Sequence, residues 1–230
     1  MNTEQNKYWE NVWSKKDLFL ISLFILLVFA PFVVIALLIN TELVFRMMII
    51  NLGSFFAITS VIFTYSKRKG VNIKEFVFKT PGFKWMFIAV LIALGVVIIG
   101  GGLSSAFSKL LNLESSDSGL INTVSSGKLW LDLINLKLIV GILIPFAEEL
   151  FFRGLIFRYL RQKNSFVMSA LLSSLIFTLA HLDPTSIFFT FLLGFSSAWV
   201  LEKTKSLIPS FLIHMGANTL AINLLLLSIF

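Results

Sequence analysis

Long apolar stretches alternate with short polar breaks along most of the chain. Several reach 18 residues or more, enough for an α-helix to cross a hydrocarbon core of about 30 Å. Seven helices are predicted, over 18–40, 42–65, 85–104, 130–157, 166–181, 185–201 and 206–229. Pro184 and Pro209 interrupt backbone hydrogen bonding, so the last apolar block is either one long helix or two short ones. The pattern predicts an all-α, polytopic transmembrane helical bundle of seven to eight spans, forming one integral-membrane domain over 1–230.

Composition supports a membrane protein. The chain is 57% hydrophobic and only 13% charged, whereas about a quarter of the residues in a soluble domain are charged. There are no cysteines, so disulfides, thiol catalysis and Cys-ligated zinc are excluded. The net charge of +7 does not indicate a nucleic-acid partner, because the basic residues sit in short loops between apolar segments, as membrane topology requires.

The distribution of Lys and Arg predicts the orientation of the chain. With the N-terminus inside, the inner segments hold 14 basic residues and the outer segments hold 3, although the longest loop, 105–129, is an outer one. This asymmetry favours a cytoplasmic N-terminus. The lysine-rich, phenylalanine-rich composition is typical of a bacterial protein. We therefore expect a multi-pass protein of the bacterial cytoplasmic membrane.

Glu148, Glu149 and Arg153 lie close together, deep inside the predicted helix 130–157, where a charge costs roughly 2.5–3.5 kcal/mol on insertion scales. Glu149 and Arg153 are four residues apart, so they share a helix face and are expected to form an ion pair. Glu148 points about 100° away from that face and is free for other chemistry. The alternative interpretation is that these side chains only hold helices together.

The two histidines of the chain lie in the same C-terminal half as the glutamate pair. His181 ends an apolar stretch, and His214 lies four residues before Asn218, so that one helix face presents an imidazole and an amide together. A single histidine in a span would more often serve as a structural hydrogen-bonding group. Two histidines, neither in a loop, favour a common polar site with the glutamates.

At these residues the sequence resembles the CPBP family of intramembrane endopeptidases, also called the Abi or CAAX protease and bacteriocin-processing family. The resemblance covers about 130–220, and the first three spans carry no motif. The family's three motifs stand here in order as Glu148-Glu149-x-x-x-Arg153, Phe177-x-x-x-His181 and His214-x-x-x-Asn218.

The resemblance implies a bundle of about eight spans around a water-filled cavity, and hydrolysis of a peptide bond. It implies that Glu148 and His181 activate water, while His214 and Asn218 stabilise the oxyanion. The residue types suit this chemistry: attack by water requires a base, and the tetrahedral oxyanion requires hydrogen-bond donors.

The resemblance gives Glu149 and Arg153 a supporting role. We favour a metal-free reaction, because no His-Glu-x-x-His helix is present. The close alternative is a zinc-dependent metalloprotease in which Glu148, His181 and His214 hold the metal, since two His and one Glu form a known catalytic zinc set.

A different class of function also fits a polytopic chain, namely a non-enzymatic immunity or regulatory membrane protein. For an enzyme, the expected partners are membrane lipid and a membrane-associated peptide or protein substrate, such as a pheromone or bacteriocin precursor. No nucleic acid is expected. The substrate, the cleavage position and the oligomeric state cannot be read from the sequence.

Overall fold

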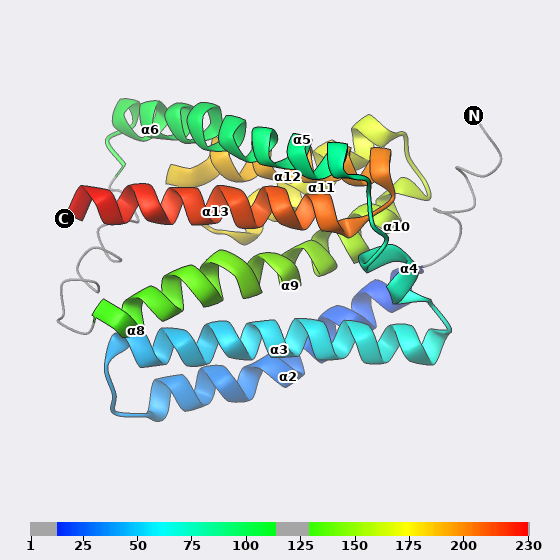
Figure 1. The fold of residues 1–230 in the computed structure, drawn as a ribbon. Coiled ribbons are helices and arrows are strands. Elements are labelled where there is room, and N and C mark those ends of the chain that lie inside the picture. The colour runs from blue at the N-terminus through cyan, green and yellow to red at the C-terminus, as the bar shows by residue number, and fades with distance from the viewer. Residues whose placement is uncertain (1–12, 114–128, 230) are drawn as a thin grey trace.

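A computed structural model describes residues 13–113 and 129–229, and in these ranges the chain is helical without a strand. Seven long helical segments are present (Figure 1), and a short helix, α4 (Ile73–Val77), was not predicted. The seven segments are α2 (Lys15–Leu38); α3 (Leu43–Lys69); α5 (Phe83–Gly95), η1 (Val96–Gly100) and α6 (Gly101–Leu110); α8 (Leu129–Leu133), η2 (Ile134–Leu143), α9 (Ile144–Phe151), η3 (Phe152–Phe157) and α10 (Arg158–Arg161); α11 (Phe166–Ala180); η4 (Pro184–Ser186) with α12 (Ile187–Thr204); and α13 (Leu207–Ile229).

The all-α membrane bundle is confirmed, and each segment overlaps one predicted span. The final apolar block is one helix, because Pro209 falls in the first turn of α13, where a missing N–H breaks no intrahelical bond. The prediction allowed an eighth span, and no eighth long helical segment is present in the described residues.

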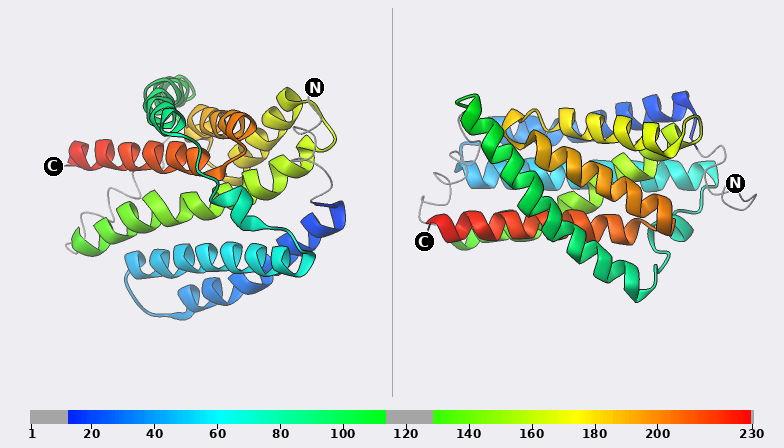
Figure 2. Two further views of the ribbon diagram at one scale, coloured as in Figure 1. Left: turned by 45° about the vertical axis from the view of Figure 1, so that its right-hand side comes forward. Right: turned by 90° about the horizontal axis from the view of Figure 1, so that it is seen from above.

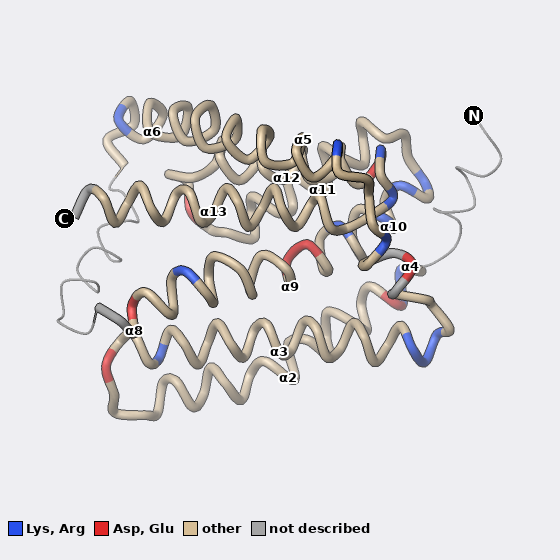
Figure 3. Tube along the Cα trace, viewed as in Figure 1, with Lys and Arg blue, Asp and Glu red and all other residues tan. Residues whose placement is uncertain are grey.

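The surface of the bundle is suited to lipid. Five helical segments are long and apolar enough to cross a membrane, and large apolar side chains are exposed on them, such as Phe19 and Leu37 on α2. Lys and Arg gather at the end of the bundle where α3 ends and α10 lies, and few occur at the opposite end (Figure 3). The chain is a multi-pass membrane protein, and the cytoplasmic N-terminus stays a prediction that this charge distribution supports.

The helices form a layered bundle. The α2–α3 hairpin forms one edge, the segment 129–161 packs on α3, and α13 packs on that segment (Figures 1 and 2). The run α5–η1–α6 and the α11–α12 pair cover α13 from the other side. Small residues allow close contacts there: a Cβ at Gly216 of α13 would lie 3.1 Å from the Cβ of Ala93 on α5.

The segment 129–161 is helical throughout, but two stretches of it are π-helical, η2 and η3, on either side of α9. The first ends just before Pro145, which has no N–H to donate and whose ring opposes the carbonyl of Gly141. A wider π turn avoids this conflict. The two π stretches set the direction in which α9 presents its glutamates, and hydrophobic periodicity does not predict them.

Candidate active site

The predicted ion pair between Glu149 and Arg153 is present and completely buried. Nη1 of Arg153 lies 3.2 Å from Oε1 of Glu149, and the two side chains are 1% and 0% exposed. The face of the Phe177 ring lies 4.5 Å from the guanidinium carbon. Burying both charges is tolerable only because each compensates the other, and the aromatic face adds a cation–π contact.

His214 lies between the two glutamates. Its Nδ1 is 2.9 Å from Oε1 of Glu149, and its Nε2 is 3.4 Å from Oε2 of Glu148. A carboxylate paired with Arg153 can only accept, so Nδ1 of His214 carries a hydrogen and donates it to Glu149. The other ring nitrogen of His214, Nε2, therefore faces the carboxylate of Glu148. An unprotonated Nε2 and an ionised carboxylate would both be acceptors and would repel each other, so either Nε2 or the Glu148 carboxyl group must carry a proton.

Glu148 is the accessible member of this group. Its side chain is 22% exposed, whereas those of His214 and Glu149 are 1% and 0% exposed. The adjacent positions thus divide as the helix geometry predicts: Glu149 points toward Arg153 and into the core, and Glu148 points to a face that solvent reaches.

His181 lies at the C-terminal end of α11, where its side chain is exposed. Its Nδ1 is 2.8 Å from the carbonyl oxygen of Phe177, and because a carbonyl only accepts, Nδ1 is the protonated nitrogen. Nε2 of a neutral His181 is then a free acceptor. No hydrogen bond or ion pair joins His181 to Glu148, and the imidazole that contacts Glu148 is that of His214.

Asn218 follows His214 by one turn of α13, so the two side chains share a face as predicted. Its Nδ2 donates to the carbonyl oxygen of Val140 at 3.4 Å, a long hydrogen bond to the π-helical stretch η2. Asn218 therefore lies against the same helical segment that carries the glutamates, where an amide donor could turn toward a bound substrate.

The proposed zinc set is not gathered into a metal site. Within the ranges 13–113 and 129–229, no group of three His, Asp or Glu side chains is arranged so that it could hold a metal ion. Both nitrogens of His214 already face carboxylates, and His181 approaches neither glutamate. This geometry gives the zinc alternative no support, and its test is the chelation experiment described below.

Phe177 has a larger part in the site than its sequence motif suggested. Its ring lies edge-on to both imidazoles, with centroid distances of 4.5 Å to His181 and 5.5 Å to His214, and it covers Arg153. Among the 25 Phe of the chain, only the motif Phe177-x-x-x-His181 singles out this ring, and the motif does not predict its contacts with His214 and Arg153. It is a positioning residue that holds the two histidines and the arginine around one hydrophobic wall.

A second contact that the sequence did not predict joins Trp13, which precedes α2, to the helical segment that carries the glutamates. The indole N–H of buried Trp13 donates to the carbonyl oxygen of Gly154 at 2.9 Å, in the π turn directly after Arg153. Carbonyls in a π turn have poorer intrahelical partners, and a donor from outside stabilises the turn. The residue preceding α2 therefore helps to fix η3.

Replacing Trp13 by Phe is expected to lower the free energy of unfolding by about 1–3 kcal/mol, because the buried carbonyl of Gly154 loses its donor. The measurement is denaturant unfolding of the purified chain in detergent. Trp199→Phe is the matched control, since Trp199 packs edge-on against Trp85. Equal losses of unfolding free energy in Trp13→Phe and Trp199→Phe would show that the smaller ring, and not the missing hydrogen bond to Gly154, causes the loss at position 13.

Comparisons with known proteins match the part of the chain that carries these residues. Residues 130–220 match the family model described as type II CAAX prenyl endopeptidase Rce1-like. UPF0177 protein YxdF of Lactococcus lactis subsp. lactis (strain IL1403) is 30% identical over 112 residues, 48% of this chain and 59% of that protein. "Putative membrane peptidase YdiL" of Bacillus subtilis (strain 168) is 31% identical over 90 residues, 39% of this chain and 37% of that protein. No solved structure matches.

The matched segments span less than two thirds of the length of either relative. The family model covers residues 130–220 and therefore all three motifs. The segment 130–220, which carries the three motifs, is thus similar to the type II CAAX prenyl endopeptidase Rce1-like family, and the chain has bacterial relatives, one of them named a putative membrane peptidase.

Proposed function

We propose that the chain is an intramembrane endopeptidase that hydrolyses a peptide bond of a membrane-associated peptide or protein. The observation that carries the proposal is the position of His214 between two glutamates, only one of which, Glu148, is accessible. A purely structural ion pair would need one carboxylate for Arg153. The second carboxylate, held beside an imidazole on a solvated face, has the properties of a general base.

The proposed reaction begins with water activated by Glu148. Its carboxylate takes a proton from water as the oxygen attacks the peptide carbonyl, and it later delivers that proton to the leaving amine. Nε2 of His181, left unprotonated by the bond from Nδ1 to the Phe177 carbonyl, offers a second acceptor for the same water. Since these two side chains do not touch, a water molecule held between them is the geometry that the proposal requires.

The tetrahedral intermediate carries a negative charge that needs donors. His214 protonated at Nε2 would donate from the side that faces Glu148, and Asn218 would donate its amide from one turn further along α13. Glu149 supports this role, because a carboxylate at Nδ1 stabilises the protonated imidazole and fixes its orientation. Arg153 balances the charge of the Glu149 carboxylate through the buried ion pair.

The substrate class is proposed at a coarse level. A site built into spanning helices reaches peptides that are embedded in or attached to the membrane, and precursors of secreted peptides, such as pheromones or bacteriocins, are of this kind. Nothing in the site's residues distinguishes among these peptides.

The proposal is tested by incubating the purified chain in proteoliposomes with a library of hydrophobic peptides and identifying the products by mass spectrometry. New termini created by hydrolysis are expected, and their yield should persist after exhaustive chelation, because the proposed reaction uses carboxylate, imidazole and amide groups alone. Activity that is lost on chelation and restored only by zinc would contradict the metal-free version. Absence of all cleavage would leave the non-enzymatic alternative.

A further inference from the structure

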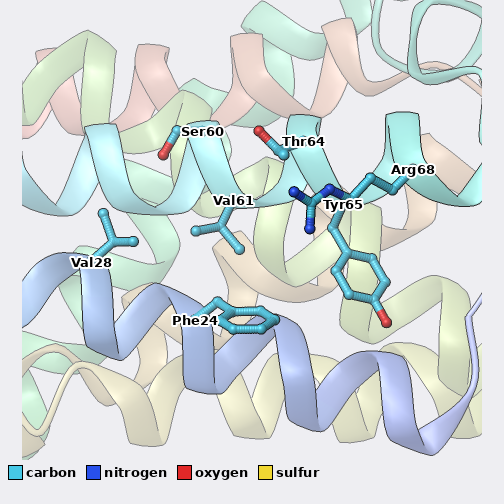
Figure 4. Close-up of a pocket in the computed structure, with 7 residues that line it drawn as sticks. All are labelled: Phe24, Val28, Ser60, Val61, Thr64, Tyr65 and Arg68. Atoms are coloured by element: carbon cyan, nitrogen blue, oxygen red, sulfur yellow. The ribbon is translucent and has the colours of Figure 1, made fainter.

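A cavity of about 280 Å³ lies between α2 and α3, away from the proposed active site (Figure 4). One wall is apolar and comes mainly from α2, with Phe24 and Val28, together with Val61 of α3. The other wall belongs to α3 and is polar. It is lined by Ser60, Thr64, Tyr65 and Arg68.

Three polar side chains form a ladder along this groove. Ser60, Thr64 and Arg68 follow one another at intervals of four residues, so they lie on one face of α3. From Arg68 to Ser60 the ladder extends about 12 Å along the helix axis, at 1.5 Å per residue. The groove thus runs from the basic end of the bundle into the hydrocarbon region.

Arg68 is the basic residue that lines this groove. Lys69 forms an ion pair with Asp17, and the hydroxyl of Tyr65 donates to the same carboxylate at 2.8 Å. Arg68 has no carboxylate partner among the residues that the structure describes, and its side chain runs back along α3 toward the groove (Figure 4). This direction, which is the usual one for a long side chain on a helix, places the guanidinium at the polar wall of the groove, where it can pair with an anion.

Thr64 provides a second donor. Some threonine hydroxyls of the bundle bond to the carbonyl four residues earlier, as Thr59 does to Phe55 at 2.6 Å and Thr204 does to Val200 at 2.8 Å, whereas the buried hydroxyl of Thr178 has no partner. Thr64 makes no such bond in the described chain, and its side chain is exposed. The groove therefore presents a guanidinium and, one turn deeper, a hydroxyl, both needing acceptors.

We propose that this groove binds one phospholipid with an anionic headgroup, whose phosphate pairs with Arg68 and whose acyl ester accepts from Thr64. A phospholipid offers acceptors in this order, phosphate first and ester deeper, followed by an acyl chain that Phe24, Val28 and Val61 would cover. The end of the bundle in question also carries exposed Lys15, Lys16 and Lys67. Excess positive charge at the membrane surface favours anionic lipids, which are abundant in the cytoplasmic leaflet.

The test uses native mass spectrometry of the full chain in detergent, titrated with dioleoyl-phosphatidylglycerol or with zwitterionic dioleoyl-phosphatidylcholine. The wild type should retain one phosphatidylglycerol and bind phosphatidylcholine more weakly. Arg68→Gln should weaken phosphatidylglycerol binding by about tenfold or more, the effect of losing a charge-assisted hydrogen bond. Lys67→Gln removes the same charge from the neighbouring position outside the groove, and a loss of no more than about fivefold is expected.

The hydroxyl is tested with a second matched pair. Thr64→Val should weaken phosphatidylglycerol binding by about threefold to tenfold, whereas Thr59→Val, whose hydroxyl bonds to its own helix, should not. The side chains of Arg68 and Thr64 are both exposed, so the variants at these positions should fold. Equal losses in Arg68→Gln and Lys67→Gln, equal binding of both lipids, or displacement by glycerol 3-phosphate alone would each overturn the proposal.

Discussion

Replacing Glu148 by Gln is expected to lower the rate of peptide cleavage by about 10²–10⁴-fold, the contribution typical of a positioned general base. Gln keeps the shape of the side chain and a carbonyl oxygen near Nε2 of His214, but it cannot take a proton from water. The measurement is the initial rate of cleavage, in proteoliposomes, of a peptide that the wild-type chain hydrolyses.

Two controls separate catalysis from folding. Glu75→Gln makes the same chemical change on α4, where the exposed carboxylate accepts from Asn72 at 2.8 Å, and it should leave the rate unchanged. Glu148 is partly exposed and lacks the ion pair with Arg153 that Glu149 makes, so Glu148→Gln should also unfold at the wild-type temperature. A stable, inserted Glu148→Gln chain that cleaves at the wild-type rate would remove Glu148 from the reaction.

Replacing Arg153 by Met is expected to destabilise the chain by about 3–5 kcal/mol, because it leaves Glu149 as a buried charge without its cation. The free energy of unfolding is measured by denaturant titration in detergent. Arg161→Met is the comparison: Arg161 pairs with Glu202 at 3.1 Å, but both side chains reach solvent, so a smaller loss is expected.

A double variant distinguishes the charge from the packing at this site. Glu149→Gln combined with Arg153→Met removes both charges and keeps an oxygen that can accept from Nδ1 of His214. Most of the stability should return, since replacing a whole buried pair is often neutral, but the cleavage rate should stay low because His214 loses the carboxylate that stabilises its protonated form. A double variant as unstable as Arg153→Met would mean that guanidinium packing against Phe177 dominates.

The sequence predicted those features that depend on one helix. Apolar runs located all seven segments, the four-residue spacing predicted the Glu149–Arg153 pair, and adjacency separated Glu148 from Glu149. Each of these follows from the 3.6-residue repeat and the length of a membrane span. The family motifs indicated which polar residues belong to one site. Spacing along the chain could not show which of these side chains contact one another.

Features that depend on contacts between helices were not predictable in the same way. Periodicity places His214 on a face of α13 but does not say which carboxylate that face meets, and the structure gives it both glutamates. The same limit applies to Phe177, one ring among many similar ones, and to Trp13, whose partner Gly154 is 141 residues away. The π stretch η2 was not predicted, because the conflict between Pro145 and the carbonyl of Gly141 alters the helical repeat itself.

The central claim, that this chain hydrolyses peptide bonds through Glu148, is tested most directly by comparing membrane and secreted peptides from cells that carry the wild type or Glu148→Gln at equal levels. Mass spectrometry should find a defined set of peptide termini in the wild type that are missing with Glu148→Gln, together with the uncut precursors accumulating in the membrane. Identical sets of termini and precursors in the two strains would contradict the claim.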